Sequence, residues 1–173
     1  MRTFIQFTSR NMAKSSNYYL AFELKGNLFA ANFPRIYGFT REYTYLSLTN
    51  FSENVPGIAL VHTEYIPVFD LSKKIGYSEK TYTGTEKLMI LEAEVYDTKL
   101  RFAIPYDQLG DAFELSAKKM MPAPSVGSIF EKGYIKGMYM HQEDVIYIIN
   151  FEKLIDIDDL IDIKIAPNRL VAR

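Results

Sequence analysis

Residues 57–75 read GIALVHTEYIPVFDLSKKI, and residues 137–155 repeat their pattern without a gap as GMYMHQEDVIYIINFEKLI. Each copy has a glycine, an apolar strand, a polar corner, a second strand, an Asp or Asn, and a short amphipathic run that contains a lysine. A chain that repeats a hairpin and the helix after it builds one small β unit twice. Because a solenoid needs about three copies or more, we expect two related subdomains that pack on each other.

The composition of the 173-residue chain suits a packed β protein. Apolar residues make up 48% of it and aromatic residues 14%, which excludes global disorder. The 13 Tyr and 12 Phe favour strands. The lack of cysteine excludes disulfides, thiol catalysis and thiolate metal sites, and it fits a reducing compartment. A net charge of −1 gives no electrostatic basis for binding nucleic acid.

The chain shows no signal for membrane insertion or export. No apolar run reaches the roughly 18 residues that a membrane span requires. Residues 1–17 lack the apolar core of a signal peptide and are expected to form a flexible arm. We therefore expect a cytoplasmic protein.

Further hairpins extend the duplication beyond the opening repeat. The turns Lys25-Gly26-Asn27 and Tyr96-Asp97 each separate two apolar runs, and a proline follows each hairpin, Pro34 or Pro105. We expect Pro105 to end its strand and residues 106–110 to form a helical turn. Near the C-terminus, the periodicity predicts a helix over residues 151–165, followed by a tail.

With the repeat placed, the chain resembles the CheW-like domain of the chemotaxis coupling protein CheW and of the histidine kinase CheA. The family's strand-and-helix motif appears as Tyr65-Ile66-Pro67-Val68-Phe69-Asp70-Leu71, with Lys73 and Lys74 following. Its C-terminal signature appears as Tyr134-Ile135-Lys136-Gly137 and as residues 148–154, IINFEKL. The opening strand 19–24 and the Pro-x-Pro loop at residues 122–124 also fit, so the resemblance covers about residues 18–156 in order.

The chain departs from the family at the corner of the first repeat. The Arg-Gly that the family carries there is His62-Thr63, and the family's Asn is Leu60. The family's arginine is linked to receptor coupling, so this departure indicates a divergent member with a different receptor set or assembly.

The resemblance implies a mainly β fold, in which two intertwined five-stranded SH3-like barrels are joined by short helices and followed by a C-terminal helix. We expect the domain to span residues 18–156, with subdomain 1 at about 18–84 (with strand exchange), subdomain 2 at about 85–156, and the end of the helix and a tail at 157–173.

The resemblance also implies a non-enzymatic adaptor, without cofactor or metal, that joins the cytoplasmic tip of methyl-accepting chemotaxis receptors to the regulatory domain of CheA. The alternative is a CheW-like scaffold for a non-chemotaxis or specialised receptor system, such as surface motility. The implied sites are a receptor groove at Ile36, Phe39, Gly57, His62 and Gly137, a kinase surface at Thr63, Glu64, Tyr65 and Pro67, and a ring interface at Ser125, Val126 and Phe130.

The residues themselves carry no catalytic motif. No serine lies in a G-x-S-x-G elbow, and His62 and His141 lie at the corners of different hairpins. The acidic run 156–162 lacks the glycine and final glutamate of an EF-hand loop, so we interpret it as a solvated helix face. Two other classes are weaker alternatives: a nucleic-acid-binding barrel, which the balanced charge disfavours, and an enzyme.

Overall fold

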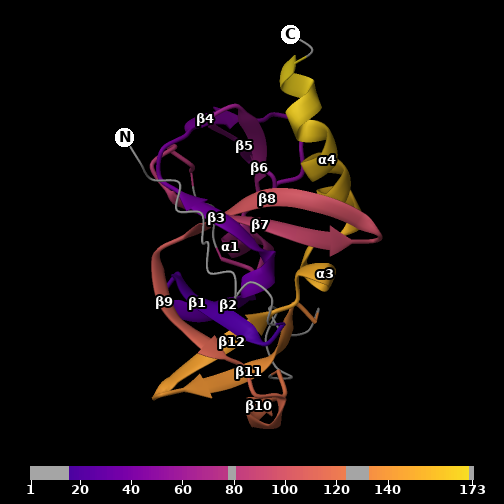
Figure 1. The fold of residues 1–173 in the computed structure, drawn as a ribbon. Coiled ribbons are helices and arrows are strands. Elements are labelled where there is room, and N and C mark those ends of the chain that lie inside the picture. Colours follow the sequence, from indigo (N-terminus) through magenta and orange to yellow (C-terminus); the bar gives the residue numbers. More distant parts are fainter. Residues whose placement is uncertain (1–15, 78–80, 124–132, 172–173) are drawn as a thin grey trace.

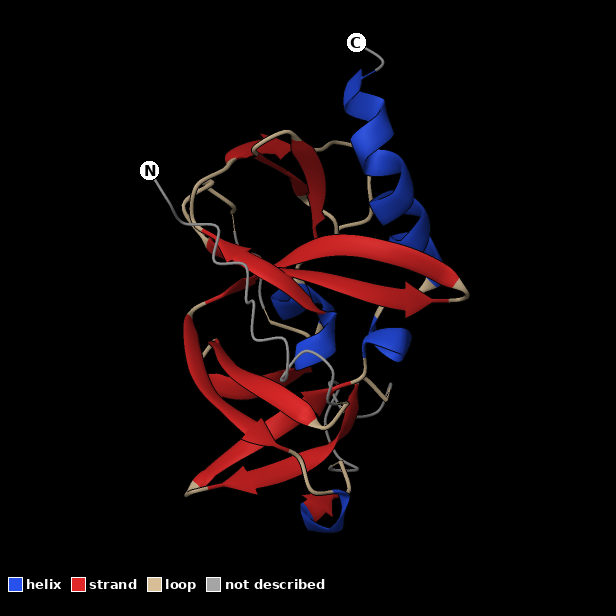
Figure 2. Ribbon diagram, in the orientation of Figure 1, coloured by secondary structure: helices blue, strands red, loops and turns tan. Residues whose placement is uncertain are grey.

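The computed structural model describes residues 16–77, 81–123 and 133–171, which form two curled β-sheets with short helices between them and a longer helix at the C-terminus (Figures 1 and 2). The first half of the chain contains β1 (Tyr18–Leu24), β2 (Asn27–Asn32), the 3-10 helix η1 (Phe33–Arg35), β3 (Ile36–Thr40), β4 (Thr44–Ser47), β5 (Gly57–Val61), β6 (Glu64–Val68) and α1 (Leu71–Lys74).

The second half repeats this order of strands. It contains β7 (Lys87–Val95), β8 (Thr98–Tyr106), β9 (Gln108–Glu114), the 3-10 helix η2 (Ala117–Lys119), β10 (Met120–Met121), β11 (Ile135–His141), β12 (Asp144–Ile149), α3 (Phe151–Leu154) and α4 (Ile157–Val171). The predicted repeat thus corresponds to β5, β6 and α1 in one half and to β11, β12 and α3 in the other.

The two sheets have the same strand order, but each takes strands from both halves. The first sheet runs β4-β5-β6-β8-β7-β3, and the second runs β10-β11-β12-β2-β1-β9. Hairpin β1–β2 therefore joins the sheet of the second half, and hairpin β7–β8 joins the sheet of the first (Figure 1). The hairpins enter through parallel pairs, Val68 with Ala103 in one sheet and Tyr147 with Phe29 in the other. The two halves are intertwined by this exchange.

Among the described residues, three apolar clusters form the interior. One lies inside the first curled sheet and includes Ala59, Ile66 and Val68, and a second lies inside the other sheet and includes Phe113 and Ile146. The largest cluster lies between the sheets and joins side chains from both exchanged hairpins, the short helices and α4. Its members include Phe22, Phe29, Leu91, Phe102, Phe69, Phe151, Leu160 and Ile163.

The mainly β fold with two related β subdomains is confirmed, and each sheet of the described structure has six strands where five were expected. The additional strands are short and lie at sheet edges: β4 pairs with β5, and the two-residue β10 pairs with β11. The subdomain boundaries predicted at residues 84 and 156 stay predictions.

Pro105 does not end its strand as predicted, and residues 106–110 do not form a helical turn. β8 continues to Tyr106, and β9 begins at Gln108 and pairs with β1. Among the described residues, β8 pairs with β6 only at Ala103, so the edge of β8 that faces β6 needs no donor at Pro105.

The C-terminal helix is broken and extends further than predicted. Ile155 is extended (φ −91°, ψ 110°), and the Asp156 carboxylate then accepts the backbone N–H groups of Asp158 (3.1 Å) and Asp159 (3.0 Å). This side-chain cap starts a new helix. The helix passes through Pro167, and the residues predicted to form a tail continue it to Val171, with Ala166 buried.

Candidate partner-binding surfaces

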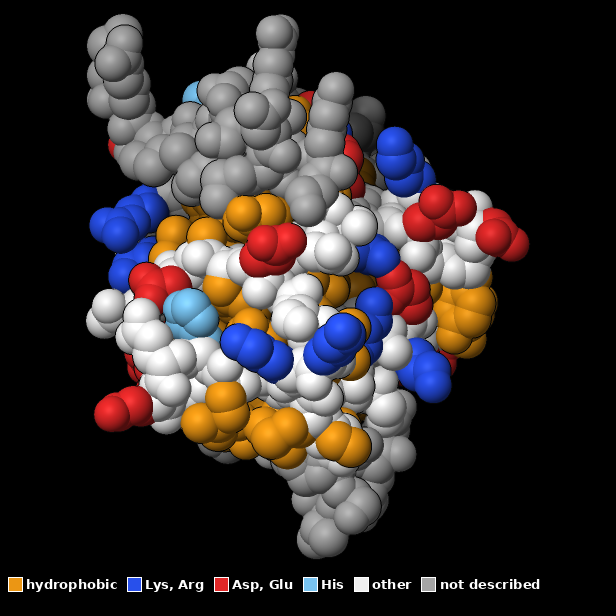
Figure 3. Space-filling view, turned by 60° about the horizontal axis from the view of Figure 1, so that its bottom comes forward, with side chains coloured by type: hydrophobic (Ala, Val, Ile, Leu, Met, Phe, Trp, Pro, Cys, Tyr) orange, Lys and Arg blue, Asp and Glu red, His pale blue; other side chains and the backbone are white. Residues whose placement is uncertain are grey.

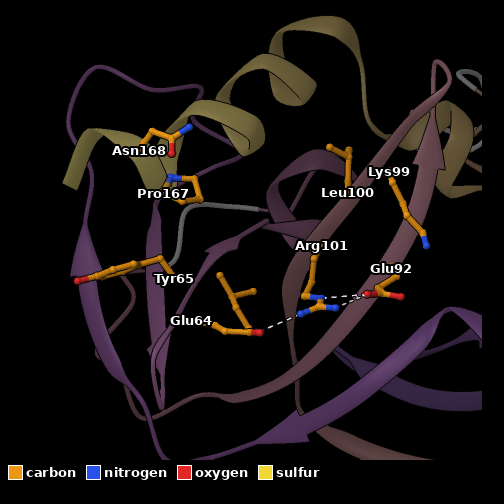
Figure 4. A pocket seen from close by; sticks show the side chains of 9 residues that line it. Glu64, Tyr65, Glu92, Lys99, Leu100, Arg101, Pro167 and Asn168 are labelled. Carbon is orange, nitrogen blue, oxygen red and sulfur yellow. Dashed lines mark hydrogen bonds and ion pairs between the residues drawn. The ribbon is translucent and has the colours of Figure 1, made fainter. Parts of the chain in front are cut away.

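A groove opens where β6 and β8 diverge, and the last turns of α4 close one side of it (Figure 4). In the described part of the chain the two strands pair only at Val68 and Ala103, so their more distant ends leave a space of about 450 Å³ between them. Its walls are formed by Glu64, Tyr65, Ile66, Glu92, Lys99, Leu100, Arg101, Pro167 and Asn168. We call this space the β6–β8 groove.

Arg101 is held in a fixed position in the β6–β8 groove by two carboxylates. Its guanidinium donates to Glu64 (2.9 Å) and, through Nε, to Glu92 (3.0 Å), and it lies 3.9 Å from the ring centroid of Tyr37. Burial opposes the charged form, but the hydrogen bonds to Glu92 and Glu64 outweigh it and raise the pKa of Arg101. The groove therefore presents a permanent cation beside two acceptors.

Three of the four residues predicted to bind a kinase lie at the surface. Thr63 is exposed in the β5–β6 turn, Glu64 holds Arg101, and Tyr65 is 38% exposed in the wall of the groove. Pro67 is buried and lies opposite Ile58 in the β5–β6 ladder, so its role in the structure is packing. The sequence does not identify Arg101, Glu92 or Pro167 as neighbours of Tyr65, because they are far away along the chain.

The residues predicted to form a receptor groove lie on both sheets and differ in exposure. Ile36 is half-buried on β3, and His62 is exposed in the β5–β6 turn. Phe39 is buried and makes an edge-to-face contact with Tyr106, with ring centroids 5.9 Å apart. Gly57 lies on β5 of the first sheet and Gly137 on β11 of the second, and both are buried.

The two glycines make room for strands of the protein itself. A Cβ atom at Gly57 would lie 2.5 Å from the carbonyl oxygen of Leu46 on β4, and one at Gly137 would lie 2.6 Å from that of Met121 on β10. The space beside these two predicted receptor-groove positions is thus filled by an edge strand in both subdomains. The residues predicted for the ring interface, Ser125, Val126 and Phe130, lie outside the described residues.

Contrary to the prediction, the acidic run 156–162 is not simply a solvated helix face. Asp159 is 1% exposed and accepts hydrogen bonds from Lys74 Nζ (2.6 Å), Ser52 Oγ (2.8 Å) and Asn54 Nδ2 (3.0 Å). Lys74 also donates to Asp156 (2.6 Å). Burial would lower the pKa of Lys74, but its hydrogen bonds to Asp156 and Asp159 raise it above its usual value. These contacts fasten the start of α4 to α1 and to the loop before β5.

Asp156, Asp158, Asp159 and Asp162 also line a hollow of about 440 Å³ with Ser52 and Asn54. Within the described ranges, no set of three or more acidic, His or Cys side chains is arranged to hold a metal ion. None of the helices described combines the length and the apolar character that crossing a membrane requires.

Comparison with known proteins identifies a family and a related fold. The family described as CheW-like domain matches residues 18–159. The fold is similar to the crystal structure of the scaffolding protein TtCheW from Thermoanaerobacter tengcongensis, with a TM-score of 0.68 and 18% sequence identity over 84% of this chain and 96% of that chain. No curated protein sequence matches the chain.

Proposed function

Because the chain belongs to the CheW-like domain family, we propose that it is a non-enzymatic adaptor that couples the cytoplasmic tips of chemoreceptors to the histidine kinase CheA in bacterial chemotaxis. The family match over residues 18–159 is the observation that carries this proposal. In such a role the protein acts by binding alone, and its place in the cell is beside the cytoplasmic ends of the receptors.

The β6–β8 groove and the adjoining turn are the kinase-binding surface in this proposal. Tyr65 offers an exposed aromatic ring at the rim, and aromatic side chains often dominate the binding energy of protein interfaces. Arg101 and Glu64 give the same surface a fixed pattern of charge, which favours one orientation of the partner. Thr63 extends the surface across the β5–β6 turn, and the buried Pro67 packs within the same strand, β6, as Tyr65.

The receptor-binding surface is proposed at Ile36 and His62, which are the accessible members of the predicted groove. Phe39 and Gly57 support it indirectly, because they are buried on β3 and β5, the strands next to the accessible residues, whereas Gly137 is buried on β11 of the other sheet. The ring interface at Ser125, Val126 and Phe130 remains a proposal from the resemblance to the family.

A second candidate function is a CheW-like scaffold for another receptor class or for a motility system. The observation that favours it is the His62-Thr63 corner, since it replaces the family's Arg-Gly at a position linked to receptor coupling. Under this alternative the fold and the kinase surface are kept, and the receptor differs.

Calorimetric titration with the regulatory domain of CheA from the same genome tests the proposal. We expect saturable binding, and we expect Tyr65→Glu to weaken it by about tenfold or more, because a charge would replace an aromatic anchor at the rim of the groove. The control is Tyr96→Glu, which changes an exposed tyrosine in the β7–β8 turn and should leave binding unchanged. Absence of binding at high micromolar concentration would overturn the kinase-coupling role.

A further inference from the structure

Each sheet has an equivalent face that points away from its own core, and among the described residues helix α4 covers this face of the first sheet. On β5 and β6, Ala59, Ile66 and Val68 point into the first sheet's own core. Ile58 and Pro67 alternate with them and point to the opposite face, which we call the outer face. Helix α4 lies against β5, β6 and β8, and Ile58 and Pro67 are buried.

The repeat identifies the matching positions of the second sheet. Eighty residues after Ile58, Leu60, Tyr65 and Pro67 come Met138, Met140, Val145 and Tyr147. In the β11–β12 ladder Met138 lies opposite Tyr147 and Met140 opposite Val145, and Met121 of β10 lies opposite Met138. Directly paired residues share a face, so these side chains form one apolar surface. We call the surface made by Met121, Met138, Met140, Val145 and Tyr147 the methionine face.

The methionine face is more open than its counterpart at three of the four matching positions. Met140 is 46% exposed where Leu60 is half-buried, and Met138 and Tyr147 are half-buried where Ile58 and Pro67 are buried. Val145 is 39% exposed, about as much as Tyr65 at its matching position, and Met121 is 36% exposed. The reason lies in the connections. Helix α3 leads into α4, which crosses to the first sheet, whereas α1 leads into a segment in which residues 76–77 and 81–86 contain no helix.

Basic side chains adjoin the methionine face. Lys118 and Lys119 are exposed directly before Met120 and Met121. Figure 3 shows a row of hydrophobic side chains along the bottom of this side of the molecule, with Lys or Arg side chains above it. Flexible methionine side chains suit such a surface, since they adapt to the shape of a helix.

We propose that the methionine face is a docking site for an amphipathic α-helix of a partner protein, with an apolar stripe on Met140 and Val145 and acidic residues beside Lys118 and Lys119. In this proposal the partner helix lies against the methionine face of the second sheet, as α4 lies against the outer face of the first sheet. The β6–β8 groove belongs to the first sheet, and the methionine face belongs to the second. The proposed helix site therefore does not depend on the proposed binding of a kinase at the groove.

Fluorescence anisotropy of a labelled synthetic peptide tests the site in the full chain. The peptide is an amphipathic helix with a leucine stripe flanked by glutamates, and its control carries lysines in place of the glutamates. We expect saturable binding of the glutamate peptide and a loss of about tenfold or more in the double variant Met140→Lys/Val145→Lys. Leu109→Lys is the matched control, because Leu109 is 42% exposed on β9 at the other edge of the same sheet.

A second variant tests the charge preference without changing the apolar surface. Lys118→Glu/Lys119→Glu should weaken binding of the glutamate peptide and strengthen binding of the lysine peptide. The proposal is overturned by a lack of saturable binding, by equal affinity for both peptides, or by an equal loss in Leu109→Lys. It is also overturned if sedimentation shows a dimer that Met140→Lys/Val145→Lys dissociates, because the face then meets a second copy of the chain.

Discussion

Gly57 and Gly137 show how one residue type fixes the same local structure twice. Each lies at the start of a repeated hairpin, and each faces an edge strand that approaches too closely for a side chain. The atoms that a Cβ would meet include the backbone oxygens of Leu46 and Met121, which cannot rotate away as a flexible side chain can. The glycines therefore permit β4 and β10 to pair at the sheet edges.

We expect Gly57→Ala to lower the free energy of unfolding by about 1–3 kcal/mol, because the added methyl group would overpack β4. Gly137→Ala should have a similar effect at β10. The control is Ser47→Ala, an exposed position opposite Gly57 on β4, which should change stability by about 0.5 kcal/mol or less. Urea denaturation measures all three variants. Equal stability of Gly57→Ala and the native protein would contradict the close approach of β4.

Helix α4 is the element whose position depends most on contacts that are distant in sequence. Asp159 binds Lys74 across 85 residues and Ser52 across 107, and these side chains lie on α1 and on the loop before β5. Buried charges are stable only when they are paired and hydrogen-bonded, and Asp159 meets both conditions. The contacts hold α4 over the outer face of the first sheet.

Asp159→Asn should destabilise the protein by about 3 kcal/mol, because it removes one member of a buried ion pair and leaves Lys74 with Asp156 alone. Asp158→Asn is the control, since Asp158 is exposed one position earlier. Through the loss of its interaction with the helix dipole, this variant should lower the free energy of unfolding by about 0.5 kcal/mol or less. Chemical denaturation followed by circular dichroism compares the two. If Asp159→Asn and Asp158→Asn lower the free energy of unfolding by the same small amount, Asp159 does not anchor α4.

Most elements follow from the sequence, and the exceptions have physical reasons. The hairpins at Gly26 and Asp97 and the Asp70 cap of α1, which accepts the N–H of Lys73 at 3.0 Å, result from local preferences that a sequence displays. The strand through Pro105 and the burial of Asp159 depend on tertiary neighbours. From the sequence alone the acidic run is expected to be solvated, because the lysine that pairs with Asp159 lies 85 residues away in the chain.

At the scale of the molecule, the exchange of hairpins ties the two halves into one structure. β1 and β2 complete the sheet of the second half, β7 and β8 complete that of the first, and both hairpins contribute to the cluster between the sheets. Neither half can form its sheet without strands from the other. The repeat in the sequence predicts two related subdomains, whereas the exchange follows from the resemblance to a family, because parallel pairing of distant strands leaves no local pattern.

We therefore expect a single cooperative unfolding transition. Thermal unfolding monitored by far-UV circular dichroism and by tyrosine fluorescence should give coincident curves, because the sheets share strands and a central core. Calorimetry is an independent check, since the van't Hoff and calorimetric enthalpies should agree. Two resolved transitions would mean that the sheets unfold independently.

The candidate site could be predicted only in part. Thr63, Glu64 and Tyr65 lie at the surface around the β6–β8 groove, but Arg101 and the end of α4 enter it through tertiary structure. Phe39 and Pro67 are buried, and apolar residues of a binding groove cannot be told from core residues by their type alone.

The proposed function of this chain is to couple receptors to a kinase by binding both. Its most direct test is phosphorylation of CheA from the same genome in receptor-containing membranes, measured with and without the protein. We predict that kinase activity responds to receptor ligand only when the protein is present, and that Tyr65→Glu abolishes this response while Tyr96→Glu preserves it. A kinase that is equally active and equally responsive without the protein would contradict the claim.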